Sequence, residues 1–282
     1  MRKLILICFV LAGLSINAQE KKVDSTSNWT KKGTFSLLFN QSSFSNWIAG
    51  GENSVAGTIS INYDFNYKSE NWTWDNKIIS KYGISNVSGT GTRKTDDQFE
   101  FNSLLGKKAS KNWSYSFLLN IRSQFTDGFD YSTTPKTVTS KFFAPGYVTL
   151  GPGMVYKKSD NFTMHLSPAT TKATFVSKEL TANGSVFGVD QGETSRYELG
   201  FYAALFYKAT LMENVTMENI FNAYSNYLED PQNIDLNYQI NFVMQINKYL
   251  STNLNLHMIV DDNASSGVQF KQLFGLGVNY IF

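Results

Sequence analysis

Residues 55–67 read VAGTISINYDFNY, and their side chains alternate between an apolar and a polar face. The apolar face runs from Val55 to Tyr67, and the polar face includes Thr58, Asn62 and Asp64. Successive side chains of a β-strand point to opposite faces, so the pattern predicts a strand with one apolar side. This predicted strand is longer than a usual strand of a soluble protein, which has about 5–6 residues. It is long enough to cross a bilayer at a tilt.

The same alternation recurs along the chain, most clearly in residues 113–125 and 234–247. A soluble β-sandwich also alternates, but it seldom places aromatic residues at both ends of long apolar faces, as membrane barrels do. The sequence therefore predicts an all-β fold, a transmembrane antiparallel up-and-down β-barrel of about twelve strands. Residues 136–144 and 173–180 also have some strand character, so barrels of ten or fourteen strands are alternatives to twelve. The predicted strands are 33–44, 54–68, 71–84, 96–109, 112–126, 145–158, 161–171, 195–209, 214–227, 234–247, 252–261 and 268–282.

Residues 1–18 have the pattern of a secretory signal peptide. Arg2 and Lys3 precede an apolar run that is too short for a membrane helix, and the small residue Ala18 suits the cleavage site. Cys8 is the only cysteine and lies inside this segment, so the mature chain offers no disulfide or thiol chemistry. We expect a signal peptide at 1–18, a short periplasmic segment at 19–32 and the barrel at 33–282.

Short and long connections alternate between the predicted strands, with long loops near 45–53, 85–95, 127–144, 172–194, 228–233 and 262–267. Membrane barrels have short periplasmic turns and longer outer loops, which predicts an even strand number and both termini in the periplasm. Four short turns are followed by Asn, an apolar residue and Ser or Thr, and Asn suits a turn because it tolerates the left-handed conformation. These four asparagines are Asn71, Asn112, Asn161 and Asn214.

The chain ends in residues 268–282, which read VQFKQLFGLGVNYIF. Alternating apolar residues that end in Tyr280 and Phe282 are similar to the sorting signal that the barrel-assembly machinery of the outer membrane recognises. The expected partners are therefore that machinery and outer-membrane lipid, and the expected location is the cell outer membrane. The net charge of +2 argues against nucleic acid as a partner.

One segment carries a family resemblance. Asn40 and Gln41 are followed by Asn46, Trp47, Gly50 and Gly51 in the pattern NQ…NWxxGG. This pattern resembles an uncharacterised, Bacteroidota-type family of outer-membrane β-barrels that is known only as a domain of unknown function. The resemblance implies the barrel and its location, and it brings no activity.

Charged residues of both signs fall on the polar, lumen-facing side of the predicted strands. Paired charges would plug the barrel and favour a structural or partner-binding protein, whereas hydrated charges would line a narrow channel that orients a polar solute. The residues singled out as lining the lumen are Asp64, Asp75, Lys77, Glu100, Arg122, Arg196, Glu198, Glu218 and Lys271.

The histidines His165 and His257 also fall on the lumen side. Barrel phospholipases turn their histidine toward lipid, and no spacing here suggests a metal site, so we expect no enzyme, no catalytic residues, no metal and no cofactor. The leading hypothesis is a narrow channel or transport barrel for small polar solutes. The alternative is a non-enzymatic structural or accessory barrel that binds a partner through the loops 127–144 and 172–194.

Overall fold

The strands of the computed structural model lie within the residues that the structure describes, 27–43, 52–265 and 267–282. The expected signal peptide at 1–18 and the motif residues Asn46, Trp47, Gly50 and Gly51 lie outside them. The strands are β1 (Trp29–Ser42), β2 (Ser54–Lys68), β3 (Trp72–Val87), β4 (Gly91–Lys108), β5 (Trp113–Ser123), β6 (Gly128–Asp130), β7 (Thr137–Ser140), β8 (Gly146–Ser159), β9 (Phe162–Phe175), β10 (Ser195–Met212), β11 (Val215–Asn226), β12 (Ile234–Gln245), β13 (Leu250–Val260) and β14 (Gln269–Ile281). No helix among these residues is long and apolar enough to span a membrane.

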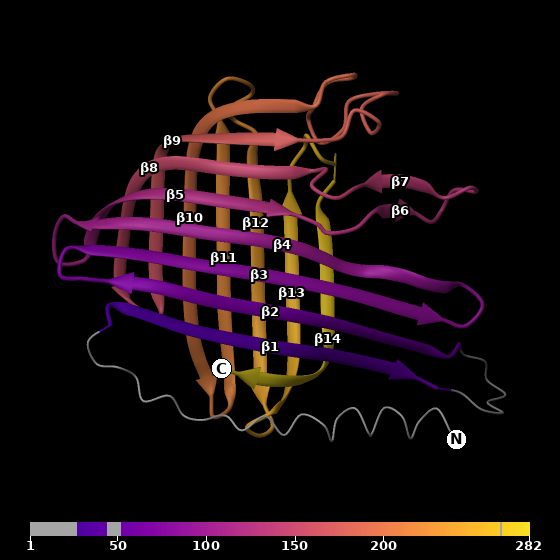
Figure 1. Cartoon of the computed structure of the whole chain (residues 1–282), viewed down its shortest axis with the longest axis horizontal. Coiled ribbons are helices and arrows are strands. Elements are labelled where there is room, and N and C mark those ends of the chain that lie inside the picture. Colours follow the sequence, from indigo (N-terminus) through magenta and orange to yellow (C-terminus); the bar gives the residue numbers. More distant parts are fainter. Residues whose placement is uncertain (1–26, 44–51, 266) are drawn as a thin grey trace.

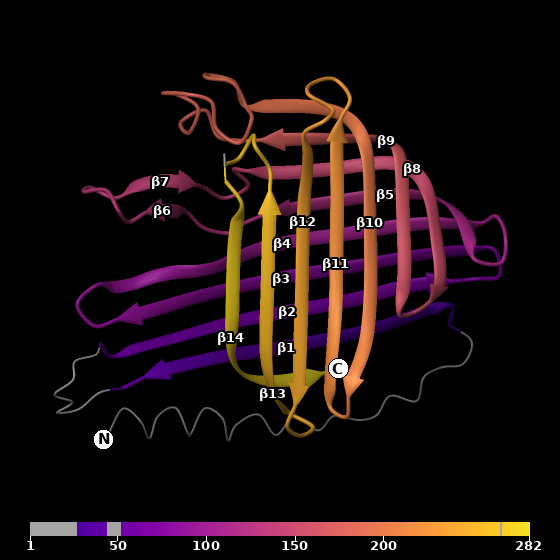
Figure 2. The ribbon, with the colours of Figure 1, turned by 180° about the vertical axis from the view of Figure 1, so that it is seen from behind.

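Twelve of these strands form a closed antiparallel barrel in which every strand pairs with its neighbours along the chain, and β1 pairs with β14. The prediction of an antiparallel up-and-down barrel is confirmed. The strands β1–β5, β8 and β9 run along one side of the barrel and cross β10–β14 on the other side at a steep angle (Figures 1 and 2). Strands of a closed barrel tilt against its axis, so the two walls cross in projection.

The closing seam joins the two ends of the described chain. Gly33 and Phe282 exchange two backbone hydrogen bonds, of 2.7 and 2.9 Å. The ring of Phe282 lies over Gly33, where a Cβ atom would come within 2.2 Å of it, so a larger residue would displace the ring. The ring stacks against Tyr63 and Tyr280. The terminal aromatic therefore locks the last strand onto the first.

The outer wall of the barrel is apolar. Large hydrophobic side chains are exposed on every barrel strand except β9, β11 and β13, among them Phe35, Ile59, Phe117, Phe201 and Phe274. Most of the buried side chains are instead polar or charged. A soluble sheet protein buries its apolar side chains, so this reversed arrangement is that of a transmembrane barrel whose outer wall meets lipid.

The short turns form a connected rim at one end. The backbone carbonyls of Asn71, Asn112 and Asn161 accept hydrogen bonds from the amide groups of Lys108, Lys157 and Lys208, each beside the next turn along the barrel. The carbonyl of Asn214 accepts one from Gln245 in the same way, and only this asparagine of the four has a positive φ, of 62°. The repeated asparagines thus mark turns that are bonded side by side.

Several predicted boundaries were wrong. The first strand begins at Trp29, so residues 29–32 belong to the barrel and not to a separate N-terminal segment. The expected long loop at 85–95 is a tight turn at 88–90 with positive φ at Gly89 and Gly91, and β3 and β4 continue toward it. A register shift at Gly83/Ile84 interrupts the alternation there, which hid the strand continuation from the sequence pattern.

The loop between β5 and β8 contains the small two-stranded sheet of β6 and β7, which projects beyond the barrel at the long-loop end (Figure 1). Residues 137–140 therefore pair in this separate sheet and add no strand to the barrel. Residues 173–175 instead extend β9. This result resolves the choice between ten, twelve and fourteen strands in favour of twelve.

Candidate functional site

The inner wall can be recognised by side chains that meet although their strands are not neighbours. Lys271 on β14 donates a 3.1 Å hydrogen bond to Asp96 on β4. Lys172 on β9 donates one of 2.7 Å to Asp235 on β12. Such contacts can form only across the interior of the barrel, so these residues line the lumen.

Lys172 is the centre of the lumen section at the long-loop end of the barrel, which is called the outer section below. Its ammonium lies 2.7 Å from Asp235, 3.5 Å from Glu198 and 4.0 Å from Asp261. The lysine side chain is 13% exposed and that of Glu198 is 3% exposed, so the cluster is largely shielded from bulk water. One lysine thus connects carboxylates from β10, from β12 and from the residue after β13 across the lumen.

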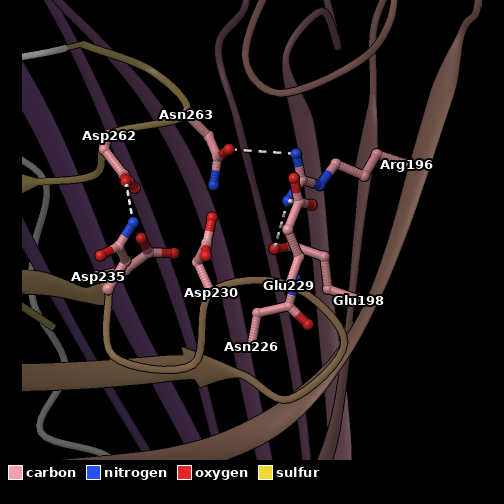
Figure 3. A pocket seen from close by; sticks show the side chains of 9 residues that line it. Arg196, Glu198, Asn226, Glu229, Asp230, Asp235, Asp262 and Asn263 are labelled. Atoms are coloured by element: carbon pink, nitrogen blue, oxygen red, sulfur yellow. Dashed lines mark hydrogen bonds and ion pairs between the residues drawn. The ribbon is translucent and has the colours of Figure 1, made fainter.

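Arg196 holds the loops above this constriction together. Its guanidinium donates hydrogen bonds to the Gly188 carbonyl at 3.0 Å, to Asn263 at 3.1 Å and to Glu229 at 2.8 Å. These partners belong to the β9–β10, β13–β14 and β11–β12 connections, and Figure 3 shows Asn263 and Glu229 converging on Arg196. The outer mouth is therefore organised around one cation.

A pocket of about 30 Å³ lies beside Arg196 at the mouth. Its lining carries five carboxylates but only one guanidinium, so the pocket is acidic. The lining residues are Arg196, Glu198, Asn226, Glu229, Asp230, Asn233, Asp235, Asp262 and Asn263.

Three of the acidic residues at the mouth could also hold a metal ion. One oxygen from each of Asp235, Asp261 and Asp262 lies within 4.8 Å of the others. Oxygen ligands of this kind suit hard cations such as Ca²⁺. Lys172, however, already supplies positive charge to Asp235 and Asp261.

In the middle section of the lumen, Glu100 and Arg122 make no ion pair among the described residues. Glu100 lies directly opposite Arg122 in the strand register, yet its carboxylate accepts hydrogen bonds from the amides of Gln98, Asn102 and Asn120. Arg122 places its guanidinium over the ring of Tyr147, 4.9 Å from the ring centroid. These two charges are thus satisfied by neutral groups.

Lys81 shares this middle section. It lies near enough to Asp96 and Lys271 to feel both charges, but it forms no ion pair within the described part of the chain. The side chain of Asp96 is only 3% exposed, and its second carboxylate oxygen has no hydrogen-bond partner there. A charge without a counter-ion is costly unless water solvates it, so this section favours a hydrated lumen.

The remaining predicted lumen residues lie toward the short turns. Asp64 and Lys77 face each other on β2 and β3 at 3.8 Å, and Glu218 bonds Lys208 across β11 and β10 at 2.7 Å. Asp75 on β3 lies on the same inward register as Lys77 and makes no ion pair among the described residues. The nine predicted residues therefore do not converge on one site, but are spread along the lumen.

The histidines occupy the inner wall without catalytic partners. His165 reaches across β8 to Ser116, with 3.1 Å between its Nε2 and the serine Oγ. It passes over Gly153, where a Cβ atom would come within 2.9 Å of the ring. His257 contacts the Asn237 side chain at 3.0 Å. No carboxylate hydrogen-bonds to either ring in the described ranges, so the third member of a catalytic triad is not provided by these contacts.

Sequence reasoning missed Lys172, Asp96 and Asp261 as lumen residues. Lys172 was assigned to a long loop because a register shift in β9 breaks the alternation before it. Asp96 and Asp261 stand at the two ends of predicted strands. Their parity with Glu100 and His257 was the signal that could have placed them in the lumen.

The long loops are joined by an exposed ion pair. Lys141, after β7, contacts Glu179 in the β9–β10 loop. The hydrogen bond from Lys141 to Glu179 raises the pKa of the lysine. In the β6–β7 sheet, Lys136 lies over the ring of Phe129 at 3.7 Å. These contacts give the outer loops a defined arrangement.

Comparison with known proteins supplies a family match but no activity. No curated protein matches the chain. Solved structures with a similar fold include the translocator domain of the autotransporter NalP from Neisseria meningitidis, at 11% identity and a TM-score of 0.41, covering 100% of this chain and 95% of that chain. An outer membrane channel from Pseudomonas putida F1 has 10% identity and a TM-score of 0.40, covering 92% and 99%.

The outer membrane channel DcaP of Acinetobacter baumannii has 10% identity and a TM-score of 0.34, covering 90% of this chain and 97% of that chain. The strand pairing, and not these distant similarities, establishes the barrel. Residues 39–129, less than half of the chain, match a family described as a protein of unknown function (DUF3078).

Proposed function

We propose that this protein is a narrow channel of the outer membrane that passes small polar solutes through a hydrated lumen. The observation that carries the proposal is the middle section, where Lys81 has no ion-pair partner and one carboxylate oxygen of Asp96 has no hydrogen-bond partner among the described residues. Charges in this state require water around them. Water along the inner wall is the condition for the passage of polar solutes.

The Lys172 cluster is the constriction of the proposed channel. A solute must pass the carboxylates that this lysine connects, so small solutes pass and large ones are excluded. The acidic mouth above it concentrates cationic and hydrogen-bond-donating solutes. The proposal assigns no catalytic role to the inner-wall histidines, whose hydrogen-bond partners in the described chain are Ser116 and Asn237.

Liposome swelling tests this function. Vesicles with the refolded protein should swell in solutions of glycine or arabinose faster than vesicles without protein, and swelling should slow with increasing solute size. A matched barrel with Lys208→Met, which leaves the constriction intact, should behave like the wild type. Swelling no faster than in protein-free vesicles, for every solute, would overturn the proposal.

A second candidate function is an accessory barrel that binds a protein partner. The observation in its favour is the projecting β6–β7 sheet and its loop, in which Phe142 is 69% exposed. A photoreactive residue in place of Phe142 would crosslink such a partner in intact membranes. Without a specific crosslinked product, this candidate loses its support.

A further inference from the structure

The outer wall has a groove that contains a polar group. Asn219 lies on the outward register of β11, between Tyr207 of β10 and Ile240 of β12. A groove of about 650 Å³ surrounds it, a volume in the range of small-molecule sites. The lining residues are Phe162, Leu205, Tyr207, Met217, Asn219, Phe221 and Tyr238.

The amide of Asn219 is only half satisfied. Its oxygen accepts a 2.9 Å hydrogen bond from the hydroxyl of Tyr238. Its amide nitrogen has no hydrogen-bond partner among the described residues, so two N–H donors remain available. In a wall that meets hydrocarbon, no water is present to accept from them, and an unmet donor is costly.

A second outward asparagine shows how an outward side-chain amide is hydrogen-bonded in this barrel when its role is structural. Asn76 of β3 is 1% exposed, and its amide nitrogen donates to the carbonyls of Phe65 at 3.1 Å and Trp74 at 3.2 Å. Its oxygen accepts from Ser103, which in turn accepts from the indole of Trp74. Every polar atom of Asn76 is thus satisfied within the wall, whereas Asn219 presents its donors to a groove.

We propose that the groove around Asn219 binds a phospholipid, with an acyl chain along its apolar lining and an ester carbonyl accepting a hydrogen bond from the Asn219 amide nitrogen. An ester carbonyl accepts but does not donate hydrogen bonds, which complements the two remaining donors. It is also joined directly to an acyl chain, which complements Leu205, Met217 and Phe221.

The position of the groove along the barrel identifies the leaflet. Phe162 is the first residue of β9, and Met217 is the third residue of β11, so the groove lies toward the short-turn end. Membrane barrels keep their short turns on the periplasmic side. The ligand therefore comes from the periplasmic leaflet, where the lipids are phospholipids.

Native mass spectrometry of the purified full-length barrel tests the site. The probes are dipalmitoyl phosphatidylethanolamine and its diether analogue, which lacks the ester carbonyls. The wild type should bind the ester lipid about tenfold more tightly than the Asn219→Leu variant, the value of one good hydrogen bond. The two proteins should bind the diether lipid equally. Leu205→Trp, which fills the groove, should weaken binding of both lipids.

Thr252→Leu is the matched control, because Thr252 is an outward polar residue of β13 outside the groove. This variant should bind both lipids like the wild type. Equal binding of the ester lipid by wild type, Asn219→Leu and Leu205→Trp would overturn the proposal. Displacement of lipid by a second copy of the chain, seen as a dimer that Leu205→Trp abolishes, would also overturn it.

Discussion

The outer and middle sections of the lumen carry similar residue types, but their charged side chains have different partners. In the outer section, Lys172 is surrounded by carboxylates, and Arg196 ties the loops above it. In the middle section, Arg122 rests on an aromatic ring and Glu100 is held by amides. The comparison teaches that a polar inner wall is not by itself a channel or a plug. Ion pairs bridge the lumen in one section, and under the proposed function the less paired charges of the next section are hydrated.

The largest loss of unfolding free energy is expected when the outer section loses the cation of Lys172. Lys172→Met leaves Glu198, Asp235 and Asp261 facing one another in a poorly solvated space. Removing one partner of a buried ion pair typically costs about 3–5 kcal/mol. The free energy of unfolding in lipid vesicles, measured by urea titration of tryptophan fluorescence, should fall by about that amount. An unchanged unfolding midpoint would show that the cluster is hydrated like the middle section.

A smaller effect is expected where the two sections meet. Asp96→Asn removes the charge that holds Lys271 across the lumen, while the side chain keeps its shape. Since one carboxylate oxygen already lacks a partner, the loss should be about 1–3 kcal/mol, below that of Lys172→Met. The same urea titration measures it. A loss larger than that of Lys172→Met would reverse the ranking of the two clusters.

In the middle section, a change of charge should alter selectivity more than stability. Arg122→Met removes a cation that has no carboxylate partner within ion-pair distance in the described chain. The reversal potential in a salt gradient should shift toward the equilibrium potential of the cation, because the lumen loses positive charge and becomes more cation-selective. The unfolding free energy should change by about 1 kcal/mol or less, the scale of one exposed cation–π contact. An unaltered reversal potential would place Arg122 off the conduction path.

The smallest effect is expected for an ion pair near the short turns. Lys208 and Glu218 lie 2.7 Å apart, but their side chains are 41% and 31% exposed. Exposed ion pairs contribute about 0–1 kcal/mol, and salt screens them. Lys208→Met should therefore leave the urea midpoint nearly unchanged. A loss comparable to that of Lys172→Met would mean that solvation does not explain the difference between the sections.

Much of this fold could be predicted because alternation is a local property. The segment 55–67 shows its two faces directly in the sequence, and nearly every barrel strand was placed within a few residues. The errors fall where the alternation breaks, at the register shifts near Gly83 and in β9. Lys172 was lost for this reason, because its side of the sheet depends on a bulge that the sequence does not show.

The site was less predictable because pairing across a lumen is not local. The residues Arg122 and Glu100 could be placed on the inner wall by parity alone. Whether they meet depends on the barrel's shape and on nearby amides such as Asn120. Asn219, in contrast, has the same parity as Met217 and Phe221, which places it on the apolar face, although only the groove gives it a role.

Single-channel conductance in planar bilayers tests most directly whether an ion-paired constriction limits flow through a hydrated lumen. The wild type should show a small conductance, and the double variant Lys172→Met/Asp235→Asn should show a larger one, because it removes the 2.7 Å pair that crosses the lumen. If neither protein conducts, or if the double variant conducts no better than the wild type, the account is contradicted.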